Sequence, residues 1–259
     1  DPRDIAGISY AAKDDPKRTV RQMLQDGYTD AFIVVKDNTM LYEQYFNGMA
    51  ADSFHLLNSV SKSFVGMLAG IQIARELIDE TDLVTQYIPE LANTAFSGST
   101  IRHLLDMTAA PKYGEDYADP EADFWVETQV LGWRPALKNR DSTATLLAYA
   151  KTRTESEQLD GEKFHYRTVL TNILGMVLQR ACSIDLQDQL QNEIWKKLGP
   201  EQDAAVVVDS DGFPYFGAGM NACARDLARF GQMIVQQGQF NGEQIVPKDW
   251  INDTRYADD

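Results

Sequence analysis

The stretch SVSKSFVGMLAGIQIARELIDE, residues 59–80, decides the fold of this chain. From Phe64 to Ala74 almost every residue is apolar or small, which predicts a helix that is buried on most of its sides. We expect this helix to end at the acidic IDETD turn that follows. Small side chains would let neighbouring elements approach the helix closely, and they are Gly66, Ala69, Gly70 and Ala74.

Strand signals lie on both sides of this helix along the chain. Residues 31–46, AFIVVKDNTMLYEQYF, alternate around a polar KDNT turn and predict a β-hairpin. Residues 204–216, AAVVVDSDGFPYF, predict a strand with a DSDG turn. An amphipathic helix over residues 224–238 and a short hairpin over residues 239–247 follow.

These segments predict an α/β protein of the α+β kind, with an antiparallel sheet flanked by helices and a second, mostly helical lobe. We assign residues 1–80 and 201–259 to the sheet-containing lobe, and residues 81–200 to the helical lobe. The predicted strands are few and short for a sheet that covers so buried a helix. We therefore expect C-terminal strands of the sheet to be missing from this chain.

The chain is strongly acidic, with 39 Asp and Glu against 24 Lys and Arg and a net charge of -15. Such a surface repels polyphosphates, so we expect no nucleic-acid partner. No apolar run approaches the roughly 18 residues that span a bilayer, and the N-terminus lacks the basic start and apolar stretch of a signal peptide. A processed secreted protein would look the same, so a periplasmic, secreted or cytoplasmic location stays open, as does the oligomeric state.

The sequence also predicts no metal site and no organic cofactor. The two cysteines, Cys182 and Cys223, are not in C-x-x-C spacing, and the three histidines form no H-E-x-x-H pattern. The DSDG segment lacks the remaining ligands of a calcium loop, so a hairpin turn explains it better. The acidic run EDYADPEAD, residues 115–123, is interpreted as a solvated loop.

Ser59 is followed three residues later by Lys62, a spacing that no other serine in the chain has. Positions three apart on a helix share a face, so the hydroxyl and the amine can meet. A helix N-terminus favours developing negative charge, and a buried amine gives up its proton more readily than an exposed one. The pattern alone fits an N-capping serine and a solvated lysine equally well. The apolar helix that follows Lys62 favours the catalytic interpretation.

Tyr166 is the second candidate, in the segment GEKFHYRTVLTNILG, residues 161–175. It stands at the start of a predicted helix, after a glycine-containing turn. A phenol near an ammonium group ionises more easily and can pass protons between a nucleophile and a leaving group. On spacing alone, a core tyrosine with a satisfied hydroxyl explains this residue better.

The order of several segments resembles the class C β-lactamase-like, penicillin-recognising serine hydrolases, a family with β-lactamases, D-alanyl-D-alanine carboxypeptidases and esterases. The resemblance covers about residues 30–250 and rests on SVSKSF, ELIDETDLVTQYIPEL, STIRHLLDMTAA, GEKFHYRT and GMNACARDLARFGQMIVQQGQFNGEQIVP. The segments GEDYADP and LGWRP are most similar to the 6-aminohexanoate-dimer (nylon-oligomer) hydrolase branch.

The resemblance implies a hydrolase that cleaves a small-molecule amide or ester through a covalent acyl-enzyme. Ser59 would be the acylated nucleophile, Lys62 its base partner and Tyr166 the second proton-transfer residue. The backbone N–H of Ser59 would supply half of an oxyanion hole. The matching EDYxDP segment implies that Tyr117 contributes to the substrate site. A β-lactamase or a D-alanyl-D-alanine carboxypeptidase is the alternative within the family.

The chain departs from the family pattern in two places. The tyrosine motif ends in Thr168 where asparagine or serine is usual, but a threonine hydroxyl can still hydrogen-bond to substrate. The third family motif, Lys-Thr-Gly or His-x-Gly on a late strand, does not occur and would lie beyond residue 259. We therefore expect part of the active site to be absent from this chain. The HTSG-like loop of the family is replaced here by DMTAA, so the sequence does not determine the shape of the active-site entrance.

Other interpretations compete with this one. A Ser-His-Asp hydrolase is disfavoured because no G-x-S-x-G occurs, and His165 is better explained as a partly exposed residue at a helix start than as a base. Trp125 and Trp133 could equally well line an apolar substrate cleft or anchor the long loop to the core. We keep Trp133 as a candidate for substrate binding. A non-catalytic ligand-binding or sensor relative would suit the missing motif, but it does not need a serine, a lysine and a tyrosine together.

Overall fold

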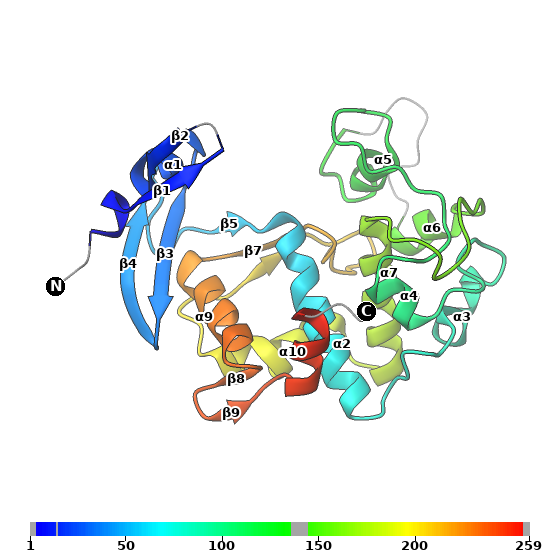
Figure 1. The fold of residues 1–259 in the computed structure, drawn as a ribbon. Coiled ribbons are helices and arrows are strands. Elements are labelled where there is room, and N and C mark those ends of the chain that lie inside the picture. Colours follow the sequence, from blue (N-terminus) through cyan, green and yellow to red (C-terminus); the bar gives the residue numbers. More distant parts are fainter. Residues whose placement is uncertain (1–3, 14, 136–144, 256–259) are drawn as a thin grey trace.

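The computed structural model describes residues 4–13, 15–135 and 145–255. Within these ranges the chain begins with a small unit that Figure 1 shows at one end of the molecule. It consists of the 3-10 turn η1 (Ile5–Gly7), the antiparallel strands β1 (Ser9–Ala12) and β2 (Asp15–Thr19), and the helix α1 (Val20–Asp26). Thr19 begins α1 with a reciprocal capping box to Gln22, which satisfies two otherwise free backbone N–H groups.

The predicted hairpin over residues 31–46 is confirmed as β3 (Ala31–Lys36) paired antiparallel with β4 (Thr39–Tyr45). Asp37 and Asn38 connect the strands with φ angles of 49° and 60°. Positive φ at both central residues is typical of the hairpin turn whose twist matches that of the strands. Asp and Asn tolerate this conformation better than most residues, which explains the polar KDNT turn.

The remaining strands are short. β5 (His55–Leu56), β7 (Met220–Ala222) and β6 (Ala205–Val206) form a three-stranded sheet in that order, and β8 (Gln239–Phe240) pairs with β9 (Glu243–Gln244). The strand predicted over residues 204–216 is therefore much shorter than the sequence pattern suggests, because the segment after β6 bends into turns that approach the candidate site. The predicted hairpin over residues 239–247 is confirmed.

Helix α2 (Ser61–Ala74) follows the 3-10 turn η2 (Asn58–Val60) and runs through the middle of the molecule (Figure 1). Its side chains are largely buried, and Phe64 and Leu68 have no exposed surface, as predicted. The prediction that α2 extends to the IDETD turn is wrong. The helix ends at Ala74, and Glu76 turns the chain with a φ of 59°.

The small residues of α2 let another helix approach it, as expected. α10 (Lys248–Arg255) places Trp250 against α2, where its indole nitrogen donates to the Gly66 carbonyl at 2.9 Å. A β-carbon on Gly70 would lie 2.2 Å from the Trp250 ring, so only glycine fits there.

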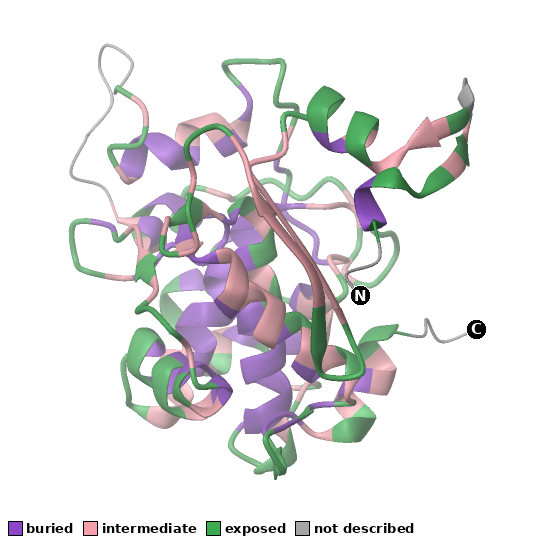
Figure 2. Cartoon of the chain, turned by 90° about the vertical axis from the view of Figure 1, so that its left-hand side faces the viewer, coloured by how far each residue is buried: buried purple, intermediate pink, exposed green. Residues whose placement is uncertain are grey.

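In the described parts of residues 81–200, helices and turns carry the fold without any named strand. They are α3 (Val84–Tyr87), η3 (Pro89–Leu91), α4 (Ile101–Leu105), α5 (Asp123–Val130), α6 (Leu146–Lys151), α7 (Thr168–Cys182), α8 (Leu186–Leu190), the π-helical turn η4 (Gln191–Trp195) and η5 (Lys196–Leu198). α7 packs against α2 and α4, and Figure 2 shows the buried core along these helices. The division of the whole chain into two lobes stays a proposal.

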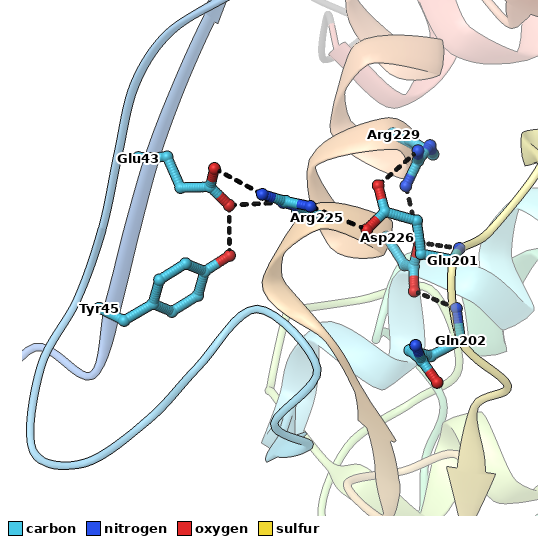
Figure 3. A network of polar contacts seen from close by, with 7 residues as sticks. All are labelled: Glu43, Tyr45, Glu201, Gln202, Arg225, Asp226 and Arg229. Carbon is cyan, nitrogen blue, oxygen red and sulfur yellow. Dashed lines mark hydrogen bonds and ion pairs between the residues drawn. The ribbon is translucent and has the colours of Figure 1, made fainter.

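The β3–β4 hairpin is joined to α9 (Ala224–Val235) by charge as well as by packing against β3. Arg225 on α9 donates to both carboxylate oxygens of Glu43 on β4, at 2.6 and 2.9 Å, and also to Glu201. Arg229 and Asp226 extend this ionic network toward the loop before β6 (Figure 3).

Among the described residues, no single helix is long and apolar enough to cross a membrane. Among these residues, only one pair of helices together has the length and apolar composition of a membrane span. This pair is Thr168–Cys182 and Leu186–Leu198, which are bent by 84° relative to each other. The first of these helices, α7, is a core helix whose residues from Thr168 to Leu178 are buried.

Candidate active site

Ser59 lies in the 3-10 turn η2 rather than in α2 itself. The preceding residue, Asn58, has a φ of 46°, a left-handed conformation that asparagine tolerates better than most residues. It redirects the chain at the start of η2, so that Ser59 lies just before helix α2. Ser59 thus lies near the N-terminus of α2, as expected, but in the 3-10 turn that precedes the helix.

The structure brings Lys62 and Ser59 together, with the lysine Nζ 3.1 Å from the serine Oγ. Lys62 is partly buried and has two further acceptors from distant parts of the chain. Its Nζ lies 3.0 Å from Thr168 Oγ1 on α7 and 2.5 Å from the Gly217 carbonyl oxygen. The amine is therefore surrounded by three oxygen atoms in fixed positions.

Tyr166 lies two residues before α7, and its ring centroid is 5.0 Å from Lys62 Nζ. The next residue, Arg167, is fully buried and holds this segment in place. Its guanidinium donates to the Ala109 carbonyl at 2.9 Å and to Glu157 at 2.5 Å. His165 also binds Glu157 and is not directed at Ser59, in agreement with its interpretation as a partly exposed residue at a helix start.

Glu115 is a site residue that the sequence analysis missed. One of its carboxylate oxygens accepts from the backbone N–H of Thr168 and the other from the Thr168 hydroxyl, both at 2.7 Å. The hydroxyl of Tyr117 also donates to Glu115, at 2.7 Å. Partial burial together with this contact raises the pKa of Tyr117 above its ordinary value. The run EDYADPEAD is thus wrongly interpreted as only a solvated loop, because its first carboxylate points inward.

Asn172, Glu127 and Tyr113 form a second group that the sequence analysis missed. Asn172 lies one turn after Thr168 on α7, and its side-chain oxygen accepts from the Gly217 N–H at 3.0 Å. Its amide nitrogen donates to Glu127 at 2.7 Å, and the Tyr113 hydroxyl donates to the other oxygen of Glu127 at 2.5 Å. Burial raises the pKa of Glu127 to about 7, and the hydrogen bonds from Tyr113 and Asn172 act in the opposite direction.

Gly217 is a glycine for steric reasons. A β-carbon at this position would lie 2.6 Å from the Thr168 methyl group and 2.9 Å from Asn172 Oδ1. The backbone can therefore approach Lys62 closely only if residue 217 has no side chain.

The structure places Trp133 beside Tyr215, with edge-to-face rings whose centroids are 5.9 Å apart. Tyr215 is fully buried, whereas Trp133 keeps 39% of its surface exposed. Trp125 instead packs against Tyr117, and the Arg134 guanidinium lies 3.7 Å from the centre of the Trp125 ring. Aromatic side chains thus lie next to Tyr117 and next to the segment that carries Gly217.

A cavity of about 600 Å³ has Ser59, Lys62 and Tyr166 in its wall. Its remaining lining combines apolar side chains with charged ones and includes Leu104, Met107, Leu174, Trp250, Arg102 and Asp253. In the part of the chain that the structure describes, no group of three or more His, Cys, Asp or Glu side chains is arranged to hold a metal ion.

One protein-family model covers most of the chain. The sequence profile described as Beta-lactamase matches residues 17–256, which is most of the chain. This chain belongs to the beta-lactamase family.

Relatives of this beta-lactamase-family chain carry a more specific name. The 6-aminohexanoate-dimer hydrolase of Paenarthrobacter ureafaciens is 34% identical over 232 residues, which cover 90% of this chain and 58% of that protein. A solved structure from Bacillus anthracis, provisionally named a 6-aminohexanoate-dimer hydrolase, matches with a TM-score of 0.90 and 28% identity over 98% of this chain and 66% of that one. EstCE1, described as a hydrolase with promiscuous acyltransferase activity, matches with a TM-score of 0.69 and 18% identity over 92% of this chain and 74% of that one.

These matches confirm the predicted family and its α/β, β-lactamase/transpeptidase-like fold. The chain spans 58% of the length of the Paenarthrobacter relative. The family is thus established for the part of the fold that contains Ser59, Lys62 and Tyr166.

Proposed function

We propose that this protein hydrolyses an amide or ester bond of a small molecule through a covalent acyl-enzyme on Ser59. The observation that carries the proposal is the set of three oxygen atoms around Lys62 Nζ, which belong to Ser59, Thr168 and Gly217. A surface lysine beside a capping serine would have no reason to be enclosed in this way.

The hydrogen-bonding capacity of these oxygens suggests the direction of proton transfer. The Gly217 carbonyl can only accept, and the Thr168 hydroxyl donates its own proton to Glu115, so it too accepts from Lys62. A neutral lysine amine has two protons and one lone pair. If both protons point at these acceptors, the lone pair points at the Ser59 hydroxyl.

In the proposed reaction, Lys62 takes the proton of Ser59 while the serine Oγ attacks the substrate carbonyl carbon. The tetrahedral intermediate expels the amine or alcohol, which leaves with a proton, and the acyl group stays on Oγ. Water then attacks the ester carbon, and the same groups take one proton from the water. They pass this proton to the Ser59 oxygen as the carboxylic acid leaves. We assign the leaving-group proton to the coupled pair Lys62 and Tyr166.

A linear amide is the first substrate class to test. Two relatives are named for the 6-aminohexanoate dimer, and the apolar side chains in the cavity wall, such as Leu104, Met107 and Leu174, suit an apolar chain. Esters, β-lactams and D-alanyl peptides remain competing classes, because the same nucleophile acts on all of them.

Covalent labelling tests the proposal most directly. A fluorophosphonate should add its mass to a peptide that contains Ser59 in the full-length protein, and Ser59→Ala should remain unlabelled and inactive while keeping its fold. A panel of linear amides, β-lactams, D-alanyl peptides and p-nitrophenyl esters then identifies the acyl group. Retention of most turnover by Ser59→Ala, or labelling at another residue, would show that the nucleophile is wrongly assigned.

A further inference from the structure

A row of buried polar side chains runs behind the Lys62 site and takes no part in the proposed reaction. Tyr113 and Glu127 are completely buried, and Asn172 keeps only 2% of its surface exposed. The row connects the loop before Glu115, helix α5 and helix α7 through hydrogen bonds of 2.5 and 2.7 Å. Burying a carboxyl group is costly, so a buried glutamate at this place needs a structural or functional reason.

The end of the row reaches the backbone that contacts Lys62. Asn172 accepts from the Gly217 N–H, and the carbonyl oxygen of the same Gly217 accepts from Lys62 Nζ. Asn172 can do this only while its oxygen faces Gly217 and its NH₂ group faces away from it. Glu127 supplies the acceptor on that other side, so it selects the orientation of the amide.

We propose that Glu127 is a positioning residue, which acts through Asn172 to hold the Gly217 carbonyl against Lys62 and thereby aims the amine at Ser59. The inference rests on the proposed function, since it assumes that Lys62 receives the Ser59 proton. Glu127 itself touches neither Ser59 nor Lys62 in this arrangement. Small displacements of a reacting group are expensive in rate, so a loose Gly217 segment would slow acylation.

Two substitutions of Glu127 separate positioning from charge. Glu127→Gln keeps an oxygen that accepts from Asn172 and gains an NH₂ group that donates to the Tyr113 hydroxyl, so the row stays connected. Glu127→Leu has a similar size but leaves the Asn172 amide without its acceptor. Gln189→Leu is the matched control, because it also removes a buried polar side chain that is 5% exposed, on helix α8 and outside the row.

The measurement is the inactivation of the full-length protein by a fluorophosphonate, with the maximal rate kinact and the half-saturating concentration KI determined separately. We expect Glu127→Leu to lower kinact roughly ten- to a hundredfold with little change in KI. Glu127→Gln should restore most of the rate, and the control should behave like the parent. If Glu127→Leu fails to fold, Asn172→Ala interrupts the row from the other side and should give the same loss.

Two results would overturn the inference. One is a folded Glu127→Leu protein with the parent's kinact, and the other is a Glu127→Gln protein as slow as Glu127→Leu. Neither result affects the assignment of Ser59. An unlabelled parent protein would instead contradict the proposed function itself, so the two failures are distinguishable.

Discussion

The buried Glu127 carboxyl should make the protein less stable as the pH rises through the neutral range. Burial raises its pKa from 4.5 to about 7, with Glu115 acting in the same direction and with Tyr113, Asn172 and Lys62 acting in the opposite one. Between these two values the folded protein keeps a proton that the unfolded chain has lost. The contribution of this proton to the free energy of unfolding is therefore fully present below about pH 4.5, and it is lost as the pH rises through about 7.

The size of the effect follows from the shift. The difference between 4.5 and about 7, at about 1.4 kcal/mol for each pH unit, corresponds to roughly 3 kcal/mol in the free energy of unfolding. Glu127→Gln has no such proton. Relative to the parent, its free energy of unfolding should therefore rise by roughly 3 kcal/mol between about pH 4.5 and about pH 8.

Urea unfolding of both proteins across this pH range measures the difference directly, because all other titrating groups are shared and largely cancel. The slope of the unfolding free energy against urea should be the same in both, which shows that the same transition is compared. A stability difference that stays constant across the range would refute the reasoning, since it would mean that Glu127 ionises alike in the folded and unfolded chain.

Three further predictions concern the site and the fold. Lys62→Ala and Tyr166→Phe should each lower turnover by at least about a hundredfold, and near-normal rates for both would contradict their shared acid–base role. Gly217→Ala should lower both the midpoint of thermal unfolding and the labelling rate, because overpacking costs roughly 1–3 kcal/mol of stability. Gly231→Ala is the control and should be neutral or stabilising, because a β-carbon there meets nothing within 4 Å. Arg180 donates hydrogen bonds to both carboxylate oxygens of Glu90, which lowers the pKa of Glu90 to about 2. The parent should therefore lose stability as the pH falls from about 4.5 toward 2, and Glu90→Gln should lose less over that range in the same urea assay.

Features that depend on local sequence were predictable. The hairpin of β3 and β4 follows from alternation around a turn. The pairing of Ser59 with Lys62 is equally local, because it depends on a spacing of three residues. The end of α2 was not predictable in this way, because the helix stops at Ala74, before the acidic turn that marks its end in the sequence.

The surroundings of Lys62 could not be predicted because they come from distant segments. Thr168 and Gly217 reach the amine from 106 and 155 residues away in sequence. Whether Glu115 points inward depends on how the loop before α5 folds against α7, which no periodicity reveals. The burial of Glu127 could not be predicted either, since a glutamate on a short helix is normally expected at the surface. The short length of β6 reflects the close approach of its following segment to the site.

The crowding around Gly217 also limits how this site can change. Every alternative amino acid at position 217 brings a β-carbon into the space of Thr168 and Asn172, so this position is closed to gradual adaptation. Reactivity can be tuned only from the walls that surround it, where Glu115 and Thr168 have side chains to vary. A directed-evolution library for new substrates is therefore best concentrated on side chains of the cavity wall, such as Leu104, Met107 and Leu174, with the glycine left untouched.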